Sequence, residues 1–228
     1  MKQDAWQSII MMTDTKLYER AFLTGADKNT EWMLPWFFDN YLEHNTYPIV
    51  FADFGVENID VIKPYVHAVI NMTNEPEQGW FKKPKSMIKC PAKRTVWIDS
   101  DCEILGNIED IFDRIVPNKL AMVQDKPWSK RLNMEMYNSG IVGFVDKPYI
   151  LWQWAKQVKE NPQRGDQETL AAMLQDPLQT LTYIEPLPNI YNWLRLQLEN
   201  DRQDSPHKRI VHWTGPKGKE RIKAKMNA

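Results

Sequence analysis

The amino-acid sequence predicts an α/β domain with a mostly parallel central sheet and helices on both faces of that sheet. Short apolar runs alternate with amphipathic segments through the first half of the chain, which is the order that a parallel sheet with helical crossovers requires. Several of these runs end directly on carboxylate or hydroxyl residues. Strands of an open α/β sheet present their carboxyl ends to the ligand crevice, so the polar endings also indicate where a site lies.

The length of 228 residues suits one domain of this class. The chain has no internal repeat, no low-complexity tract and no linker-like stretch. We therefore expect a single domain over residues 1–228, with an arm at residues 1–19 and a basic tail at residues 220–228.

The first half contains four predicted strands, each a short run of apolar, β-branched or aromatic residues: 21–24, 48–52, 66–70 and 95–98. A helix is predicted over residues 31–44, where apolar side chains recur at helical spacing. Further helical segments are expected from about Glu57, before Cys90, and over residues 108–115 with Asn107 as their cap.

The second half continues with strands at 119–124, 136–145, 181–184 and 209–213. Pro148 opens a predicted helix that runs to Lys159. Asp166 is suited to cap a helix over residues 167–175, which Asp176-Pro177 would end.

Composition excludes several classes of protein. Hydrophobic residues make up 43% of the chain and charged residues 26%, and the net charge of −1 carries no nucleic-acid signature. Two cysteines, Cys90 and Cys102, predict neither a disulfide scaffold nor a cysteine metal site, and both are expected to be buried. The N-terminus lacks the pattern of a signal peptide, and no apolar run is long enough to cross a membrane. We expect a soluble, cytoplasmic protein without a nucleic-acid partner.

The chain is organised around the stretch Thr95–Leu105. Its predicted strand ends on Asp99 and Asp101, two carboxylates one residue apart. Carboxylate oxygens at the mouth of a crevice are suitable ligands for a hard cation. An isolated Asp-x-Asp also arises by chance in loops, so the surrounding residues have to decide between the two interpretations.

No glycine-rich phosphate loop is present, so a bound nucleotide would need other groups to neutralise its phosphates. A divalent cation on Asp99 and Asp101 would do this, with basic side chains assisting. His212 is one of four histidines, and a basic segment that contains Gly215, Lys217 and Lys219 follows it. That segment predicts a flexible turn suited to a diphosphate; a core-edge histidine and a solvated basic tail are the alternatives.

Phosphohydrolases of the haloacid-dehalogenase class also carry Asp-x-Asp at the end of a strand. Their motif continues to Thr or Val two residues past the second Asp, where this chain has Glu103. Their later Gly-Asp motif is also unmet, because Gly165-Asp166 is followed by Gln167-Glu168. The phosphohydrolase class therefore fits the sequence less well than the family considered next.

Four segments, in order, resemble the retaining GT-A glycosyltransferases of family 8, the glycogenin and lipopolysaccharide galactosyltransferase kind, and their mannosyltransferase relatives. Thr95–Asp101 resembles the family's strand and metal motif, and Tyr137–Phe144 its F-N-S-G segment. Gly165-Asp166-Gln167 is similar to its D-Q pair, and the segment from His212 to Lys219 resembles its C-terminal H-x-x-G-x-x-K motif. The resemblance spans about residues 20–220 and implies a Rossmann-like GT-A fold.

The resemblance also implies roles for individual residues. Metal ligands for Mn²⁺ or Mg²⁺ would be Asp99, Asp101 and His212. Base and ribose contacts would be Thr24, Asp27 and Asp53. Groups near the diphosphate or donor sugar would be Lys83 or Lys85, and Gly215 with Lys217 or Lys219. The sugar itself would be surrounded by Asn138, Asp166 and Gln167.

The expected activity is transfer of a sugar from a nucleotide donor, UDP-linked, to a carbohydrate or other hydroxyl acceptor with retention of configuration. The sequence departs from the family after Gly215. The family's lysine would fall at Gly218, which Lys217 and Lys219 flank, and the aromatic residue typical after that lysine is missing, because Lys219 precedes Glu220 and Arg221. The alternative from another class is a nucleotide-sugar or carbohydrate-binding protein that has the fold without turnover. A metal-dependent phosphohydrolase is the third possibility.

Overall fold

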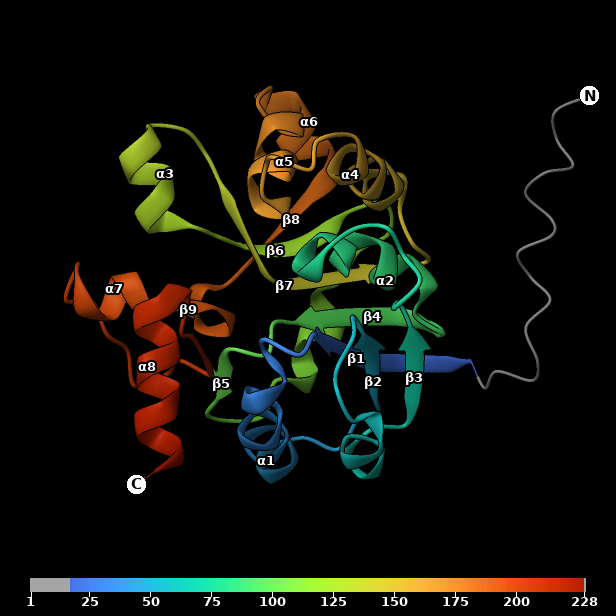
Figure 1. Ribbon diagram of the computed structural model, residues 1–228. Helices are drawn as coiled ribbons and strands as arrows, with labels where there is room; N and C mark the ends of the chain where they lie inside the picture. Colours follow the sequence, from blue (N-terminus) through green and yellow to red (C-terminus); the bar gives the residue numbers. More distant parts are fainter. Residues whose placement is uncertain (1–16, 228) are drawn as a thin grey trace, which may run out of the picture.

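The computed structural model describes residues 17–227 (Figure 1). Its central sheet has seven strands in the order β3-β2-β1-β4-β7-β6-β8. These strands are β1 (Tyr18–Ala26), β2 (Ile49–Asp53), β3 (Ala68–Asn71), β4 (Ala92–Ile98), β6 (Leu120–Gln124), β7 (Tyr137–Val145) and β8 (Ile184–Leu187). Only β7 is antiparallel to its neighbours, β4 and β6, so the predicted mostly parallel sheet is confirmed.

A second, smaller sheet continues from the end of β4. It contains β5 (Cys102–Ile104), β9 (Trp193–Leu194) and β10 (Ile210–His212), with β10 in the middle. The turn Asp99-Ser100-Asp101 therefore connects the two sheets, because β4 ends at Ile98 and β5 begins at Cys102. In the antiparallel pairing of β10 with β5, His212 lies opposite Cys102.

Eight α-helices surround the sheets: α1 (Leu34–His44), α2 (Lys83–Lys89), α3 (Lys126–Leu132), α4 (Tyr149–Glu160), α5 (Asp166–Met173), α6 (Pro177–Tyr183), α7 (Arg195–Glu199) and α8 (Gly215–Met226). Short 3-10 helices lie at Glu31–Met33, Ile59–Val61, Lys63–Tyr65, Gly79–Lys82, Glu109–Arg114 and Asn189–Tyr191. These are the elements of residues 17–227 only.

The alternation of side chains along the strands produces two apolar cores, one on each face of the large sheet. Phe22 of β1 packs in the core that contains helix α1 and Phe112. Its neighbour Leu23 points to the opposite face and packs in the core that contains α2, α4 and α5. Figure 1 shows α4 and α1 on opposite sides of the sheet. The prediction of helices on both faces is confirmed.

The predicted helix over residues 108–115 is a 3-10 helix, Glu109–Arg114, and Asn107 is not its N-cap residue. The segment still buries Ile111 and Phe112, which the apolar spacing indicated. A residue of strand β4 stabilises its last turn: Arg94 Nη1 donates hydrogen bonds to the carbonyl oxygens of Phe112 and Ile115. The helix predicted from Glu57 is likewise two 3-10 turns, the second with a proline in its first turn.

Two predictions about residues 166–184 were wrong. Residues 181–184 were expected as a strand, but helix α6 runs to Tyr183 and β8 begins only at Ile184. Asp176 caps α6 by accepting a hydrogen bond from Leu178 N, and Pro177 suits its first turn. Asp166 is the first residue of α5 rather than its cap, which is Gly165.

The basic C-terminal segment is a helix and not a flexible turn followed by a solvated tail. Helix α8 covers Gly215–Met226 and is anchored by Ile222, whose side chain is fully buried. Lys225 Nζ lies 2.9 Å from Glu103 Oε1 of β5. The buried Ile222 and several ion pairs, including those of Lys225 with Glu103 and of Arg221 with Glu199, therefore hold the basic helix against the domain.

Of the predicted arm, residues 1–16 lie outside the described residues, whereas Tyr18 and Glu19 belong to β1. Among residues 17–227, no helix is both long enough and apolar enough to cross a lipid bilayer.

Candidate active site

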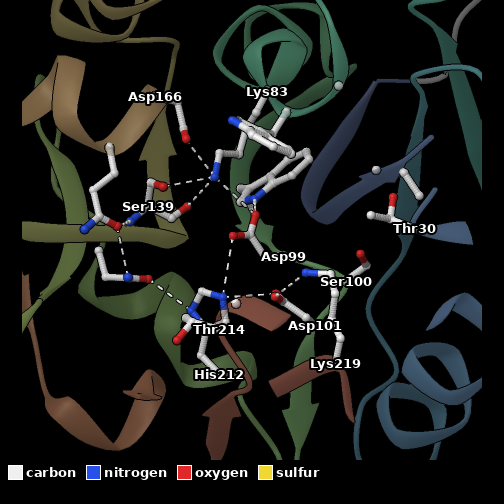
Figure 2. Close-up of a pocket in the computed structure, with 18 of the residues that line it drawn as sticks. Thr30, Lys83, Asp99, Ser100, Asp101, Ser139, Asp166, His212, Thr214 and Lys219 are labelled. Atoms are coloured by element: carbon white, nitrogen blue, oxygen red, sulfur yellow. Dashed lines mark hydrogen bonds and ion pairs between the residues drawn. The ribbon is translucent and has the colours of Figure 1, made fainter. Parts of the chain in front are cut away.

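A cavity of about 330 Å³ opens where β1 and β4 end (Figure 2). Its wall is formed by segments far apart in the sequence: the end of β1, the β4–β5 turn, α2, β7, α5, β10 and the start of α8. Ten of the predicted site residues line it: Asp27, Lys83, Asp99, Asp101, Asn138, Asp166, Gln167, His212, Gly215 and Lys219. The tertiary structure thus brings all four sequence motifs to one cavity.

Two carboxylates and one imidazole meet at the β4–β5 turn. His212 Nε2 lies 3.0 Å from Asp101 Oδ1 and 3.7 Å from Asp99 Oδ2. The other oxygen of Asp99 accepts a hydrogen bond from Trp97 Nε1 at 2.5 Å. Each acidic residue therefore directs one oxygen toward the same ring nitrogen.

His212 is held in this position from behind. Its Nδ1 lies 3.1 Å from Asn138 Oδ1 and 3.2 Å from Asn192 Oδ1. A Cβ atom on Gly140 would overlap the imidazole, so the glycine of the Asn-Ser-Gly segment leaves the space that the ring occupies. A hydrogen bond to one ring nitrogen fixes which nitrogen faces a ligand, and here that nitrogen is Nε2.

The charges of this group reinforce one another. Burial by itself would lower the pKa of His212, but the carboxylates of Asp101 and Asp99 outweigh burial and raise it. Burial would raise the pKa of Asp101, and the neighbouring His212 and Lys219 instead hold it below its usual value. Both pKa shifts therefore favour a protonated His212 beside an ionised Asp101.

Lys83 connects the acidic turn to the start of α5. Its buried Nζ lies 3.2 Å from Asp99 Oδ1 and 2.8 Å from Asp166 Oδ2, and it donates to Ser139 Oγ at 3.0 Å. Burial would lower the pKa of Lys83, but Asp166 and Asp99 raise it above its usual value. The cavity therefore contains a fixed ammonium between two carboxylates, as Figure 2 shows.

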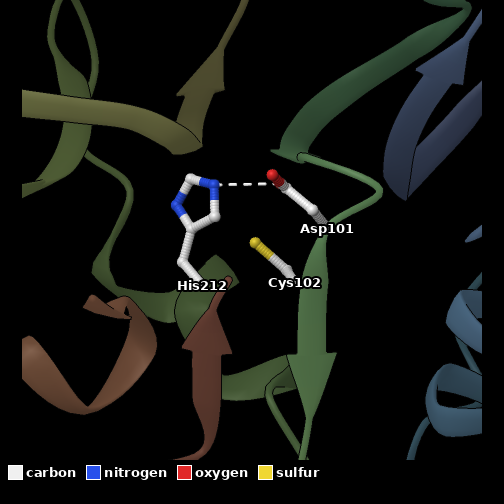
Figure 3. A group of neighbouring side chains, drawn as sticks. All are labelled: Asp101, Cys102 and His212. Carbon is white, nitrogen blue, oxygen red and sulfur yellow. Dashed lines mark ion pairs between the residues drawn. The ribbon is translucent and has the colours of Figure 1, made fainter. Parts of the chain in front are cut away.

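The donor atoms at the turn fit a divalent metal ion. Carboxylate oxygen and imidazole nitrogen suit Mn²⁺, and Asp101, Cys102 and His212 form the one group of three potential metal ligands found among residues 17–227 (Figure 3). Gly140, which lacks a side chain, leaves the space in which the imidazole of His212 reaches this group of ligand atoms. Asp101 and His212 are thus close enough to hold such an ion together, and Asp99 Oδ2 lies 3.7 Å from His212 Nε2.

Comparison with known proteins gives a match at the level of structure. No protein-family model matches the sequence, and no curated protein matches it. The glycosyltransferase GlyE of Streptococcus pneumoniae TIGR4 aligns with a TM-score of 0.65 and 16% identity over 86% of this chain and 55% of its own. For the galactosyltransferase LgtC, in complex with donor and acceptor sugar analogs, the TM-score is 0.58, with 11% identity over 90% of this chain and 94% of LgtC.

The fold is that of the GT-A glycosyltransferases. The bifunctional glycosyltransferase WbbM has a TM-score of 0.60 and 14% identity over 90% of this chain and 47% of its own. The chain therefore spans about half the length of GlyE and WbbM, and nearly all of LgtC.

Within this GT-A fold, the two candidate lysines after Gly215 face different ways. Lys219 lines the cavity, and its Nζ lies 3.7 Å from Asp101 Oδ2. Lys217 lines a separate groove with Arg195 and Arg221. At Gly218 a Cβ atom would overlap the backbone of Trp213, so no side chain is tolerated at this position.

Three further predicted residues lie outside the lining of the GT-A cavity. Asp53 Oδ1 accepts hydrogen bonds from the backbone N–H groups of Gly55 and Val56 and so closes its own loop. Lys85 forms ion pairs with Glu75 and Glu77 on the surface. Thr24 is fully buried in β1, and its hydroxyl finds no hydrogen-bond partner among the described residues.

Sequence reasoning missed several lining residues, and Asp125 is one of them. Its Oδ2 accepts hydrogen bonds from Asn138 Nδ2 at 3.1 Å and Gln167 Nε2 at 3.0 Å, and its Oδ1 caps helix α3. Asp125 directly follows strand β6. The signal that identified Asp99, a carboxylate at the end of a strand, was therefore present at Asp125 as well.

The tryptophans at the cavity were also missed: Trp80, Trp97 and Trp128. Trp97 stacks with Phe54, and Trp80 is 61% exposed. With ten tryptophans in the chain and most expected in the core, the sequence gives no sign of which ones reach the cavity.

Proposed function

We propose that this chain is a metal-dependent, retaining glycosyltransferase that transfers a hexose from a nucleotide-diphosphate donor to a hydroxyl acceptor. The observation that carries this proposal is the convergence of Asp99, Asp101 and His212 with Lys83 and Lys219 in one cavity. Two carboxylates and an imidazole suit a divalent ion, and two lysines suit phosphate oxygens.

The structural relatives support sugar transfer over the alternatives. They are described as a glycosyltransferase, a galactosyltransferase and a xyloside xylosyltransferase. We propose UDP as the nucleotide because the four sequence motifs resemble enzymes of the glycogenin and lipopolysaccharide galactosyltransferase kind. Mn²⁺ is the proposed ion, with Mg²⁺ as its substitute, and the acceptor is a carbohydrate or another hydroxyl compound.

In this proposal Asp99, Asp101 and His212 hold the metal ion, which when bound would offset negative charge on the diphosphate. Lys219 adds a second positive charge on the leaving-group side, next to Asp101. Gly215 begins α8 with a φ of 74°, a conformation that favours glycine, and lets the backbone approach the phosphates closely. These groups would stabilise the negative charge that develops on the departing diphosphate as the bond breaks.

The sugar is proposed to lie between Lys83 and the Asn138–Gln167 network. Asp166 is buried beside Lys83, so its carboxylate is held in one position by an ion pair. A carboxylate in this position would stabilise positive charge on the sugar as the glycosyl–phosphate bond breaks. Asn138 makes hydrogen bonds through both side-chain atoms, to Gly140 N, Asp125 and Gln167, and is therefore proposed to position Gln167 and His212.

The base and ribose are proposed to lie near Asp27, where the cavity is also lined by Thr30 and Trp80. Asp27 accepts hydrogen bonds from Asn29 N and Thr30 Oγ1, so its carboxylate is held rigidly at the end of β1. Asp53 and Thr24 do not line the cavity, so other residues of the cavity wall would separate them from the base and ribose.

Calorimetric titration of UDP, and then of GDP, with Mn²⁺ and with a chelator tests the proposal. We expect Mn²⁺-dependent binding of UDP, followed by slow hydrolysis of one UDP-sugar when sugars are screened. Binding that is unaffected by the chelator would contradict the metal assignment. Nucleotide-sugar binding without any hydrolysis or transfer would favour the binding-protein alternative. Absence of binding together with phosphatase activity that depends on Asp99 would favour the phosphohydrolase.

A further inference from the structure

Cys102 lies next to the proposed metal ligands, and the proposed function gives it no role. It is the first residue of β5, and the strand register sets it directly opposite His212 of β10. Residues opposite each other in an antiparallel pair have side chains on the same face of the sheet, about 4.5–5.5 Å apart at Cβ. The thiol and the imidazole are therefore cross-strand neighbours, as Figure 3 shows.

The thiol belongs to a compact group of three potential ligand atoms. One oxygen of Asp101, one ring nitrogen of His212 and the sulfur of Cys102 all lie within 4.8 Å of one another. Bonds of about 2.0–2.3 Å to a tetrahedral ion require donor atoms roughly 3.3–3.8 Å apart. Atoms that lie at most 4.8 Å apart need to draw together by up to about 1.5 Å to enclose an ion.

The other cysteine shows that burial alone does not create this arrangement. Cys90 is as deeply buried as Cys102 and is also free of any disulfide. It packs in the opposite core, and it is absent from the group of potential metal ligands found among residues 17–227. The chain therefore contains one thiol beside a carboxylate and an imidazole and one thiol without them.

We propose that Asp101, Cys102 and His212 form a binding site for a thiophilic divalent cation of the Zn²⁺ and Cd²⁺ class. Thiolate sulfur selects such ions, whereas oxygen donors suit Mn²⁺ and Mg²⁺. Binding forms a metal–sulfur bond and breaks the S–H bond, and the proton leaves to solvent. The oxygen-donor set with Asp99 and the thiol set with Cys102 share two residues, Asp101 and His212.

A thiophilic ion at this site therefore excludes Mn²⁺ from the catalytic position. This consequence rests on the proposed function, whereas the thiol site itself does not. We expect Zn²⁺ to inhibit Mn²⁺-dependent transfer, and excess Mn²⁺ to relieve the inhibition, because both ions need Asp101 and His212.

Cobalt spectroscopy on the metal-stripped full chain tests the thiol site without any enzyme assay. Co²⁺ bound to a thiolate gives a sulfur-to-metal charge-transfer band, which a site of oxygen and nitrogen donors lacks. We expect the band in the unaltered protein and in Cys90→Ser, and we expect its loss in Cys102→Ser and in Cys102→Ala. Since the chain has two cysteines, a band that survives in Cys90→Ser must come from Cys102. The Cys90→Ser spectrum therefore tests the thiol site even if neither Cys102 variant folds.

Cd²⁺ and Mn²⁺ titrations of the same proteins complete the test. Cys102→Ser should weaken Cd²⁺ binding by at least about tenfold, the low end for loss of a group that supports a metal site, while Mn²⁺ affinity stays unchanged. A cobalt complex without the band, or a band that disappears in Cys90→Ser, would overturn the proposal. If Mn²⁺-dependent UDP binding persists in that case, the thiol site fails and the proposed glycosyltransferase function stands.

Discussion

The carboxylates that follow strand β4 and the carboxylate that follows strand β2 have different kinds of partners. After β4, Asp99 and Asp101 direct oxygens at His212, a residue more than one hundred positions away, and Lys83 and Lys219 approach them from two helices. After β2, Asp53 accepts hydrogen bonds from the backbone two and three residues ahead. Both groups satisfy the same sequence criterion, a carboxylate at the carboxyl end of a parallel strand.

The difference lies in which partners the carboxylates have. A carboxylate that accepts the next backbone N–H groups stabilises its own turn, as Asp53 does through Oδ1. Among the described residues, the oxygens of Asp101 pair with the side chains of His212 and Lys219, which are charged or can become charged. A strand-end carboxylate whose partners come from distant segments is therefore the better indicator of a site.

The largest effect is expected from Asp101→Ala compared with Asp53→Asn. Loss of the Asp101 carboxylate should weaken Mn²⁺-dependent UDP binding by at least about 100-fold, since even residues behind metal ligands cost 10–100-fold. Asp53→Asn should leave UDP affinity unchanged, because the amide oxygen still accepts the loop N–H groups. Calorimetry on both variants measures this, and equal losses would abolish the distinction between the two strand ends.

A large effect is also expected from adding one methyl group at Gly140. In Gly140→Ala the new Cβ overlaps the imidazole of His212, so we expect weaker Mn²⁺ binding and a loss of about 1–3 kcal/mol of unfolding free energy from overpacking. Gly106→Ala is the matched control, because no atom lies within 4 Å of a Cβ at that position. Urea unfolding and Mn²⁺ titration separate the two outcomes; a Gly140→Ala protein with normal metal affinity would show that His212 is not a ligand.

A smaller effect distinguishes the two lysines of α8. Lys219→Ala should weaken UDP binding about tenfold, the low end for a charge-assisted hydrogen bond of roughly 1.5–3 kcal/mol. Lys217→Ala should have no such effect, because Lys217 lines a different groove. UDP titrations in the presence of Mn²⁺ measure both, and a reversed order would mean that Lys217 and not Lys219 contacts the diphosphate.

The smallest effect concerns Glu109, a carboxylate that accepts hydrogen bonds from backbone and hydroxyl groups of a distant segment, Thr46 and Tyr47. Burial would raise its pKa, but hydrogen bonds from Thr46 N, Thr46 Oγ1 and Tyr47 N hold the pKa below its usual value. A lowered folded-state pKa contributes stability above the unfolded-state pKa of about 4.3, and this contribution is lost as the pH falls through the folded-state pKa. Glu109→Ala should therefore cost about 1–2 kcal/mol at pH 7 and progressively less below about pH 4.

Asp113→Ala is the control for Glu109, because its side chain is 66% exposed and pairs only with Arg20 at the surface. We expect it to change the unfolding free energy by less than about 0.5 kcal/mol at any pH. Urea unfolding of both variants at several pH values makes the comparison. A cost at Glu109 that grows with acidity would contradict the assigned direction of its pKa.

Local sequence patterns were reliable for the large elements. The spacing of apolar residues identified helix α1 and helix α4, and the continuous apolar runs identified β2, β4 and β6. Sequence patterns were less reliable where the conformation of a short segment depends on contacts with residues far away in the sequence. The 3-10 helix at Glu109–Arg114 ends against Arg94, and α8 is ordered by Glu103 and by the burial of Ile222.

The sequence by itself determined the α/β class and the chemistry of the candidate site, because strand periodicity and residue type are local properties. Residue patterns singled out Asp99, Asp101 and His212, and the resemblance to family 8 glycosyltransferases added Asp166 and either Lys83 or Lys85; of these residues, all but Lys85 line the cavity. Only the tertiary structure decided that Lys219 faces that cavity while Lys217 and Lys85 do not, and that Cys102 lies opposite His212. The physical reason is that the orientation of a side chain depends on strand register and helix packing, which join segments far apart in the chain.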